Sequence, residues 1–300
     1  MLTIKSPLLY SFLFIVFIIL TVKELTKVKK MTAYAKWSSC FQNGIDSWNN
    51  LTTTAEFLNH AGNISSNCKI ILDLNIVKLS DSKFYISPQV QKSLTHATVG
   101  ISSNFEAESQ LKKVLELSSH HFLICQLFQR LPIINIFGAT PKLSEREREL
   151  FQKIGNYYPV AIGTKSGLVN VTMKPQYNYS LNDSAVPSSK SEFQLDLIYF
   201  LKDVLKQDFY YSIWFNIFFD ELPNMLHRNR NFDENRITLC QININIDNDQ
   251  KTNMKQFFKS LISDKRYVII FEVVNDYGVL FLINFDNTTC RKKLGIVRNV

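Results

Sequence analysis

From Leu94 onward, short apolar runs alternate with longer mixed segments, and this alternation constrains the fold more than any other feature of the chain. Strands of a parallel sheet are buried on both faces and are therefore continuously apolar, while the crossovers between them form helices. The pattern predicts an α/β domain around a mostly parallel sheet. Strands are expected at Ala97 to Ile101, Ile133 to Phe137, Val160 to Ile162, Tyr211 to Ile217, Ile237 to Ile246, Tyr267 to Val274 and Val279 to Phe285.

The sheet is expected to end in an antiparallel hairpin. Its last two apolar runs are separated only by Asn275, Asp276, Tyr277 and Gly278. Asn, Asp and Gly tolerate the backbone conformations of a tight hairpin loop.

Helices are expected between the strands. Ser103 with Glu106, and Ser144 with Glu147, have the spacing of a capping box at a helix start. Two further helices are predicted from apolar stripes at Leu195 to Leu205 and at Lys255 to Ile262.

The 300 residues divide into three parts by composition. Residues 94–300 are expected to form the main domain, with a polar loop at Pro175 to Ser191. Residues 31–93 are rich in Asn and Ser, and short strands are expected there at Lys69 to Val77 and Lys83 to Ile86. We expect this segment to be an N-terminal extension packed on the main domain. Residues 1–30 are apolar and then basic.

The run from Leu8 to Val22 carries no charge, follows Lys5 and precedes the basic cluster Lys23 to Lys30. It is shorter than the roughly 20 residues that span a bilayer, so it suits a signal-peptide core or a short signal anchor. Because no small-x-small cleavage site follows, residues 8–22 are expected to be an uncleaved, single-pass membrane anchor.

Two signals disagree on which side of the membrane the domain lies. The lysines after the apolar run favour the cytosol by the positive-inside rule. Asn-x-Ser/Thr sequons favour the lumenal or extracellular side, and the secretory pathway is the expected location. These sequons begin at Asn50, Asn63, Asn170, Asn178, Asn182 and Asn287.

Charge and cysteine content exclude some classes of partner. The net charge of +8 does not indicate nucleic acid, because no long basic run is interleaved with aromatic residues. The 5 cysteines include no Cys-x-x-Cys pair, so no zinc site is expected. Cys40 and Cys68 are candidates for a disulfide, whereas Cys125 and Cys240 are expected to be buried thiols.

Other catalytic chemistry has little support. His96 precedes the first expected strand and is placed at a pocket mouth, but the histidines form no metal-binding pattern. No Gly-x-Ser-x-Gly motif is present, which disfavours a serine hydrolase. Asp247-Asn248-Asp249 follows an apolar strand and leaves metal-dependent glycosyl transfer open, although such triplets also arise by chance.

A strand, a loop and a helix start lie between Thr98 and Glu108. Gly100 lets the backbone approach a ligand, whose polar end then faces the helix N-terminus. Further segments follow in order: Ile136 to Pro141, Gly155 to Gly163, Asp196 to Leu201, Trp214 to Ile217, Cys240 to Ile244 and Lys265 to Tyr267. This series, over about Leu94 to Leu294, resembles the FkbM-type methyltransferase domains that are numerous in nematodes.

The resemblance implies a Rossmann-like class I methyltransferase fold and S-adenosylmethionine as the methyl donor. It implies O-methyl transfer to a small molecule or a sugar. By position, Gly100, Ser102, Asn104 and Thr140 would line the donor site. Asn216 and Glu221 would be the catalytic residues.

This chain departs from the family pattern on the ligand side. Ser102 replaces a glycine, and Thr140 replaces the acid that would bind the ribose hydroxyls. Asn216 replaces an acid and is unable to serve as a general base near neutral pH. Phe218, Phe219, Asn245 and Asp247 also depart from the pattern. The alternative function is therefore a catalytically inactive, membrane-tethered binding module on the same fold.

Overall fold

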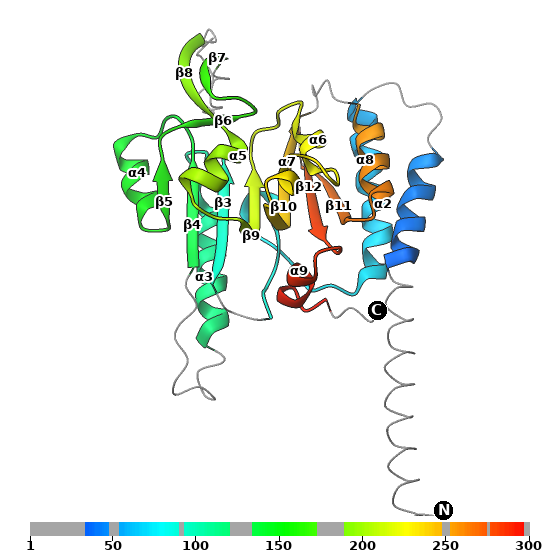
Figure 1. The fold of residues 1–300 in the computed structure, drawn as a ribbon. Coiled ribbons are helices and arrows are strands. Elements are labelled where there is room, and N and C mark those ends of the chain that lie inside the picture. Colours follow the sequence, from blue (N-terminus) through cyan, green and yellow to red (C-terminus); the bar gives the residue numbers. More distant parts are fainter. Residues whose placement is uncertain are drawn as a thin grey trace, which may run out of the picture.

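A computed structural model describes residues 34–47, 54–89, 93–120, 134–172, 189–247, 253–274 and 277–296. It contains a seven-stranded sheet in the order β11-β12-β10-β9-β3-β4-β5, flanked by helices (Figure 1). The α/β class and the mostly parallel sheet are confirmed. The strands are β3 (Leu94–Val99), β4 (Ile134–Ala139), β5 (Asn156–Tyr158), β9 (Phe209–Phe215), β10 (Thr238–Asp247), β11 (Tyr267–Val274) and β12 (Tyr277–Asn284).

The expected hairpin of β11 and β12 is confirmed, but its position in the sheet was not predicted. β12 is antiparallel to both β10 and β11, and it lies between them. The strands from β10 to β5 are all parallel to one another. The single antiparallel strand is therefore inside the sheet, and β11 forms the edge.

The strand predicted at Val160 to Ile162 formed in a different sheet, and the strand predicted at Lys69 to Val77 was wrong. The run at Val160 to Ile162 became β6 (Ala161–Gly163), which belongs to a separate sheet with β8 (Ser189–Asp196) and β7 (Gly167–Thr172). The run at Lys69 to Val77 is mostly not extended. It holds the end of α2 (Thr54–Lys69) and a 3-10 turn, η1 (Ile70–Leu72), and then the first two residues of β1 (Ile76–Lys78).

The helix starts were predicted with mixed success. The box at Ser144 is confirmed, since its hydroxyl accepts the Glu147 N–H while Glu147 Oε2 accepts the Ser144 N–H, at 3.3 Å and 2.7 Å. The box at Ser103 is wrong, because α3 begins only at Glu106, whose N–H donates to Asn104 Oδ1 (3.1 Å). The remaining helices of the main domain are α3 (Glu106–His120), α4 (Glu145–Gln152), α6 (Leu222–Leu226), α7 (Asn231–Glu234), α8 (Met254–Ser263) and α9 (Thr288–Lys293).

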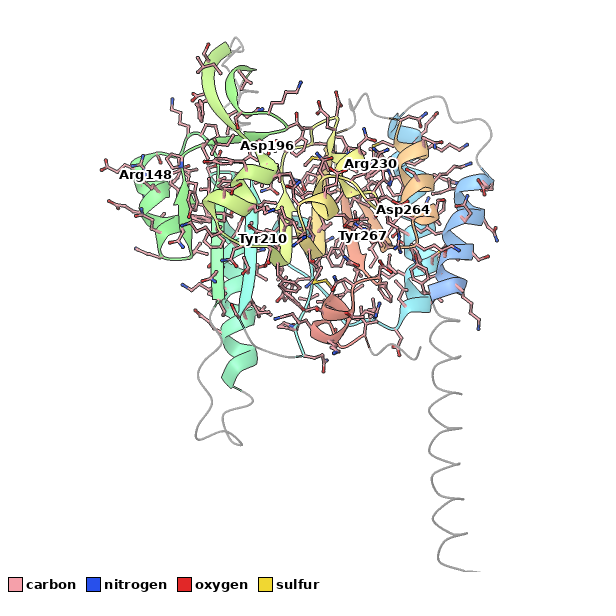
Figure 2. All side chains as sticks on the ribbon, viewed as in Figure 1. Arg148, Asp196, Tyr210, Arg230, Asp264 and Tyr267 are labelled. Atoms are coloured by element: carbon pink, nitrogen blue, oxygen red, sulfur yellow. A yellow bond between two sulfur atoms is a disulfide. The ribbon has the colours of Figure 1, made fainter. Side chains whose placement is uncertain are left out.

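The helix expected at Leu195 to Leu205 is shorter and of mixed type. Leu195 still belongs to β8, and α5 (Leu197–Tyr199) runs into a π-helical turn, η3 (Phe200–Val204). Asp196 caps α5 by accepting the Tyr199 N–H, and Tyr210 donates from its hydroxyl to Leu201 O at 2.7 Å (Figure 2). These bonds fix the segment against β9.

Residues 34–46 are helical and, with α2 and α8, lie beside β11 at one end of the sheet (Figure 1). The Ser65 hydroxyl of α2 accepts the backbone N–H of Phe271 at 2.7 Å. α2 thus covers an edge strand whose free backbone groups would otherwise be open to pairing with another chain. Trp37 and Phe41 share one continuous core with the main sheet.

One face of the sheet carries amide side chains that hold β2 (Phe84–Ile86). Asn243 accepts the Phe84 N–H (2.8 Å) and donates to Phe84 O (2.9 Å). Gln241 accepts the Ile86 N–H (2.7 Å) and donates to Ile86 O (3.1 Å). The two amides therefore replace the backbone of a neighbouring strand and satisfy buried groups that would be costly to leave unpaired.

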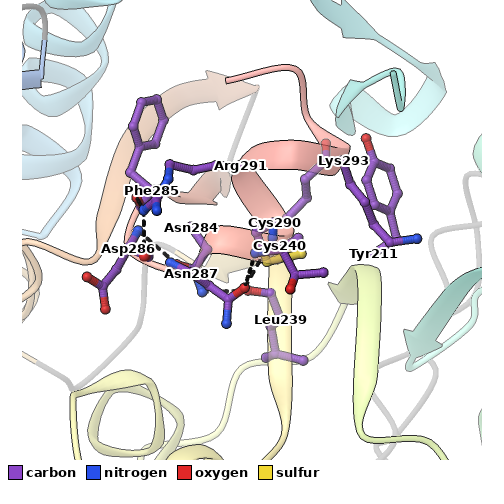
Figure 3. The surroundings of a disulfide bond; sticks show 12 residues. Tyr211, Leu239, Cys240, Asn284, Phe285, Asp286, Asn287, Cys290, Arg291 and Lys293 are labelled. Carbon is purple, nitrogen blue, oxygen red and sulfur yellow. Dashed lines mark hydrogen bonds between the residues drawn. A yellow bond between two sulfur atoms is a disulfide. The ribbon is translucent and has the colours of Figure 1, made fainter. Parts of the chain in front are cut away.

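Two disulfides join distant parts of the chain. Cys40 pairs with Cys68, as predicted, with their Cα atoms 5.8 Å apart. Cys240 pairs with Cys290 of α9 at a Cα separation of 5.1 Å, so its assignment as a free buried thiol was wrong (Figure 3). Cys125 lies outside the described residues.

The double variant Cys240→Ser/Cys290→Ser is expected to lower the free energy of unfolding by about 2–4 kcal/mol, because the crosslink restricts the unfolded chain. Urea unfolding of the oxidised protein and of the variant measures this difference. The double variant Cys40→Ser/Cys68→Ser, measured in the same way, gives the contribution of the second crosslink for comparison. Equal urea midpoints for the variant and the oxidised protein would contradict the expectation.

Among the residues that the structure describes, no helix is long and apolar enough to cross a bilayer. The predicted anchor from Leu8 to Val22 lies outside those residues.

Candidate functional site

The sheet changes direction of winding between β3 and β9. The chain leaves β3 for β4 on one side, and leaves β9 for β10 on the other. Ligands of open α/β sheets bind at the carboxyl ends of the strands at such a switch point. The register pairs Val99 and Ile244 with Phe215, so Gly100 and Asn216 follow the ends of β3 and β9, and Asn245 lies at the same level inside β10.

Gly100 has a backbone conformation that only glycine adopts readily, as a close approach to a ligand would require, but a neighbouring side chain covers it. Its φ of +81° is in the left-handed region that favours glycine, and its N–H donates to Ala139 O at 2.8 Å. A Cβ placed there would lie 2.9 Å from Ile217 Cγ2. The side chain of Ile217 therefore occupies the space directly over Gly100.

Ser102 and Asn104 are exposed and bonded within their own loop. The Ser102 hydroxyl donates to Asn104 O at 2.6 Å and accepts the Asn104 N–H at 3.2 Å. The Asn104 side chain accepts the Glu106 N–H and donates weakly to Asp81 (3.4 Å). These polar groups shape the turn and begin α3.

Thr140 and Asn216 flank Gly100 on the neighbouring strands, as predicted. Thr140 follows β4, half-buried, and its carbonyl accepts the Tyr157 hydroxyl at 2.9 Å. Asn216 donates from its backbone to Val99 O at 2.9 Å. Its side-chain Oδ1 is buried and has no hydrogen-bond partner within the described part of the chain. An unsatisfied buried acceptor therefore lies beside Gly100.

Glu221 lies in a different environment from Phe218 and Phe219. Glu221 is exposed and directly precedes α6, so it is not on the strand end that holds Asn216. Phe218 and Phe219 are half-buried and pack on the core. Phe219 contacts Phe215 edge to face, with ring centroids 6.1 Å apart. The aromatic pair thus extends the core at the position where the family has an acid and a glycine.

Close to these strand ends lies a polar group of residues, here called the carboxyl-edge cluster, in which Lys83, Thr98 and Glu108 are buried, Asn245 is half-buried and Asp81 is exposed. The Lys83 ammonium donates to Asn245 Oδ1 at 2.6 Å. Lys83 and Glu108 are each only 2% exposed. Glu108 shares a hydrogen bond with the Thr98 side chain. The Asn245 side chain is therefore hydrogen-bonded within this cluster and does not face an open ligand site.

Burial sets the charges in the cluster. It lowers the pKa of Lys83 to about 8, against the opposing effect of the Glu108 and Asp81 charges. It raises the pKa of Glu108 to about 7, against the Thr98 hydrogen bond and the Lys83 charge. Strongly shifted groups of this kind occur at functional sites and also in structural ion-pair networks.

The turn that carries Asp81 and Lys83 is strained. Asp81 and Ser82 have consecutive φ values of +53° and +55°, which non-glycine residues rarely adopt. Two bonds tie this turn to α3. The Ser80 N–H donates to Gln110 Oε1 (2.8 Å), and Gln110 Nε2 donates to the Ser80 hydroxyl (2.7 Å).

Sequence reasoning missed Lys83 and Glu108. Lys83 lies in the N-terminal extension, 25 positions before Glu108 in the numbering. Lysine and glutamate are almost never fully buried unless they are paired, so both residue types indicate a solvated surface until the contacts are known. No local pattern places them together.

His96 was predicted at a pocket mouth, which is wrong. β3 begins at Leu94, so His96 lies inside the strand and is 2% exposed. Its Nδ1 pairs with the Ser212 hydroxyl (2.6 Å) and its Nε2 with the Thr98 hydroxyl (3.0 Å). Burial lowers the pKa of His96 to about 3, so it is a neutral structural residue.

A small pocket lies at the opposite, amino-terminal edge of β10. It has a volume of about 120 Å³, and Asp233, Arg266 and Asp286 are among its lining residues. Arg266 pairs with Asp233, and Asp286 pairs with Arg228 at 3.0 Å. Because these charges neutralise one another, the pocket has the character of a structural ion-pair network. Asp247 to Asp249, the acids considered for metal binding, have no described side chains.

Comparisons of the chain with protein-family models, with curated proteins and with solved structures found no match. Its function is therefore inferred from its own geometry.

Proposed function

We propose that this chain is an FkbM-type, methyltransferase-like protein that no longer transfers a methyl group and acts as a membrane-tethered binding module in the secretory pathway. The order of the strands supports the fold part of the proposal. From β3 the sheet continues through β4 and β5 on one side and through β9 and β10 on the other. β12, the one antiparallel strand of this sheet, lies next to the edge strand β11. Class I methyltransferases share this arrangement.

The covering of Gly100 by Ile217 carries the functional part of the proposal. In the fold that the resemblance implies, the methyl donor lies over the glycine after the first strand. Here Ile217 Cγ2 would be 2.9 Å from a Cβ on Gly100, so in this side-chain arrangement Ile217 occupies that place. Thr140 also offers no carboxylate for a ribose. Both features disfavour S-adenosylmethionine as a ligand.

Among the described residues near Gly100, neither Asn216 nor Glu108 is an available general base. Asn216 carries an amide, which does not take up a proton near neutral pH. Glu108, whose pKa of about 7 would suit a base, is 2% exposed and bonded to Thr98. A base has to be within hydrogen-bond reach of the proton it removes, and a covered carboxyl is not.

The disulfides support the location. Disulfides persist in oxidising compartments and are rare in the cytosol. Both pairs described here have the Cα separations of ordinary disulfides, 5.8 Å and 5.1 Å. We infer that the domain lies on the lumenal or extracellular side, tethered through residues 8–22.

The second candidate is an active O-methyltransferase with a small-molecule or sugar acceptor. The positive φ of Gly100 and the neighbouring positions of Thr140 and Asn216 favour it. Ile217 is 40% exposed, so rotation of one side chain would uncover the glycine. The two candidates differ in whether the chain binds a donor.

Calorimetric titration of the full chain in detergent with S-adenosylhomocysteine separates the candidates. We expect no saturable heat at millimolar nucleoside. Saturable binding that is lost in Gly100→Arg would overturn the proposal and establish the second candidate. Gly167→Arg is the matched control, because Gly167 also has a positive φ but open space around its α-carbon. Saturable binding that is retained in Gly100→Arg would also contradict the proposal, because the ligand would then bind away from Gly100.

A further inference from the structure

One side of α2 faces water along its whole described length. Its buried positions follow the helical period and contact the core, whereas the positions between them are exposed. The buried set is Phe57, Leu58, Ala61, Ile64, Ser65 and Cys68. The exposed set is Asn59, His60, Asn63, Ser66 and Asn67. The outward side therefore has no large apolar side chain.

We propose that Asn63 carries an N-linked glycan. Asn63-Ile64-Ser65 is an acceptor sequon, and Asn63 lies in the middle of the outward side of α2. Such a bulky, polar group has to remain in water, which this position provides. The inference rests on the secretory location in the proposed function, for which the two disulfides are independent support.

The reaction requires a lipid-linked oligosaccharide diphosphate, the donor of the secretory pathway. A bond forms between Asn63 Nδ2 and the anomeric carbon of the first sugar. The bond from that carbon to the diphosphate oxygen breaks, the diphosphate leaves with the electron pair, and Nδ2 loses one proton.

The structure also sets when this transfer takes place. Ser65, the hydroxyl residue of the sequon, is 1% exposed and accepts the Phe271 N–H at 2.7 Å. In the folded chain this hydroxyl is unavailable to an enzyme that reads the sequon. The glycan is therefore added before α2 docks on β11, and the folded helix then holds it on the outside.

Asn287, the other sequon with a described side chain, is a poorer site. It is half-buried and caps α9, because its Oδ1 accepts the N–H groups of Thr289 (2.9 Å) and Cys290 (3.1 Å). It lies next to the Cys240–Cys290 disulfide (Figure 3). A glycan on this side chain would crowd a fixed turn, whereas Asn63 has none of these constraints.

Peptide mapping by mass spectrometry, after expression of the full chain in a secreting eukaryotic cell, tests the site. Enzymatic removal of N-glycans converts a modified Asn63 to Asp, and we expect that conversion in most molecules. Asn63→Gln should remove one glycan from the total mass. Asn59→Gln, four positions earlier on the same side of α2 and outside any sequon, should leave the mass of the glycans unchanged.

Two failures are distinguishable. An unmodified Asn63 in molecules whose cysteines are oxidised would overturn the glycan and leave the location standing. Reduced cysteines together with an unmodified Asn63 would overturn both the secretory location and the glycan.

Discussion

Asn243→Leu is expected to lower the free energy of unfolding by about 2–6 kcal/mol, since it leaves two buried backbone groups without partners at about 1–3 kcal/mol each. The Asn243 amide now binds both the N–H and the C=O of Phe84, at 2.8 Å and 2.9 Å. Leucine has nearly the same volume but neither a donor nor an acceptor. Asn243 itself is fully buried, so water does not replace the lost bonds.

Urea unfolding followed by circular dichroism measures this loss. Asn59→Leu, on the exposed side of α2, is the matched control and should change stability by no more than about 0.5 kcal/mol. A similarly small change for Asn243→Leu would show that β2 is not held by the amides. Gln241→Leu, which acts on Ile86, should give a smaller loss, because the Ile86 carbonyl still accepts the Tyr211 hydroxyl at 2.8 Å.

Relative to the unaltered protein, Glu108→Gln is expected to gain stability as pH rises from about 4 to about 7. Burial raises the pKa of Glu108 from 4.5 to about 7, so the folded state binds this proton more tightly than the unfolded chain. The resulting stabilisation is fully present below pH 4.5 and is lost as pH rises through about 7. Its size is on the order of 3 kcal/mol.

The other shifted groups do not obscure this difference. The pKa of Lys83 is lowered to about 8, so its stabilising contribution is present only above 10.5 and is lost as pH falls through about 8. It is therefore constant over the acidic range. The pKa of His96 is lowered to about 3, so its contribution to stability increases with pH over much of the same range, but it is common to the protein and the variant and cancels in their difference.

The experiment compares urea unfolding of both proteins at the two pH values. Glutamine keeps the shape of the side chain and a hydrogen bond to Thr98, so any pH-dependent difference belongs to the carboxyl group. Glu106→Gln, the loss of an exposed carboxylate two positions earlier, is the control and should alter stability little at either pH. A pH-independent difference for Glu108→Gln would contradict a buried, protonatable Glu108.

Local patterns predicted the elements whose neighbours in sequence decide their structure. The Ser144 box formed because its donor and acceptor groups are three residues apart. The β11–β12 hairpin formed because its two strands are close in sequence, β11 ending at Val274 and β12 beginning at Tyr277. The box at Ser103 failed when Asn104, also next to the helix, supplied the capping oxygen instead.

For the candidate site, the sequence predicted which residues come together but not which side chains surround them. The resemblance implied that Gly100, Thr140 and Asn216 belong to one site, and the structure places all three at the ends of neighbouring strands. The sequence did not determine which side chain covers Gly100. Ile217 covers it, because the backbone turns directly after Asn216 and Phe218 and Phe219 pack on the core.

The sequence by itself therefore determined an α/β chain with a glycine turn after its first long strand and a final hairpin. Those features depend on side-chain periods and turn residues that act over a few positions. Only the tertiary structure decided that Cys240 pairs with Cys290, that Lys83 and Glu108 are buried together, and that Ile217 covers Gly100. Each of the first two joins residues tens of positions apart, and the third depends on how two neighbouring strands end. Such contacts are selected by the packing of the whole core, which no local pattern encodes.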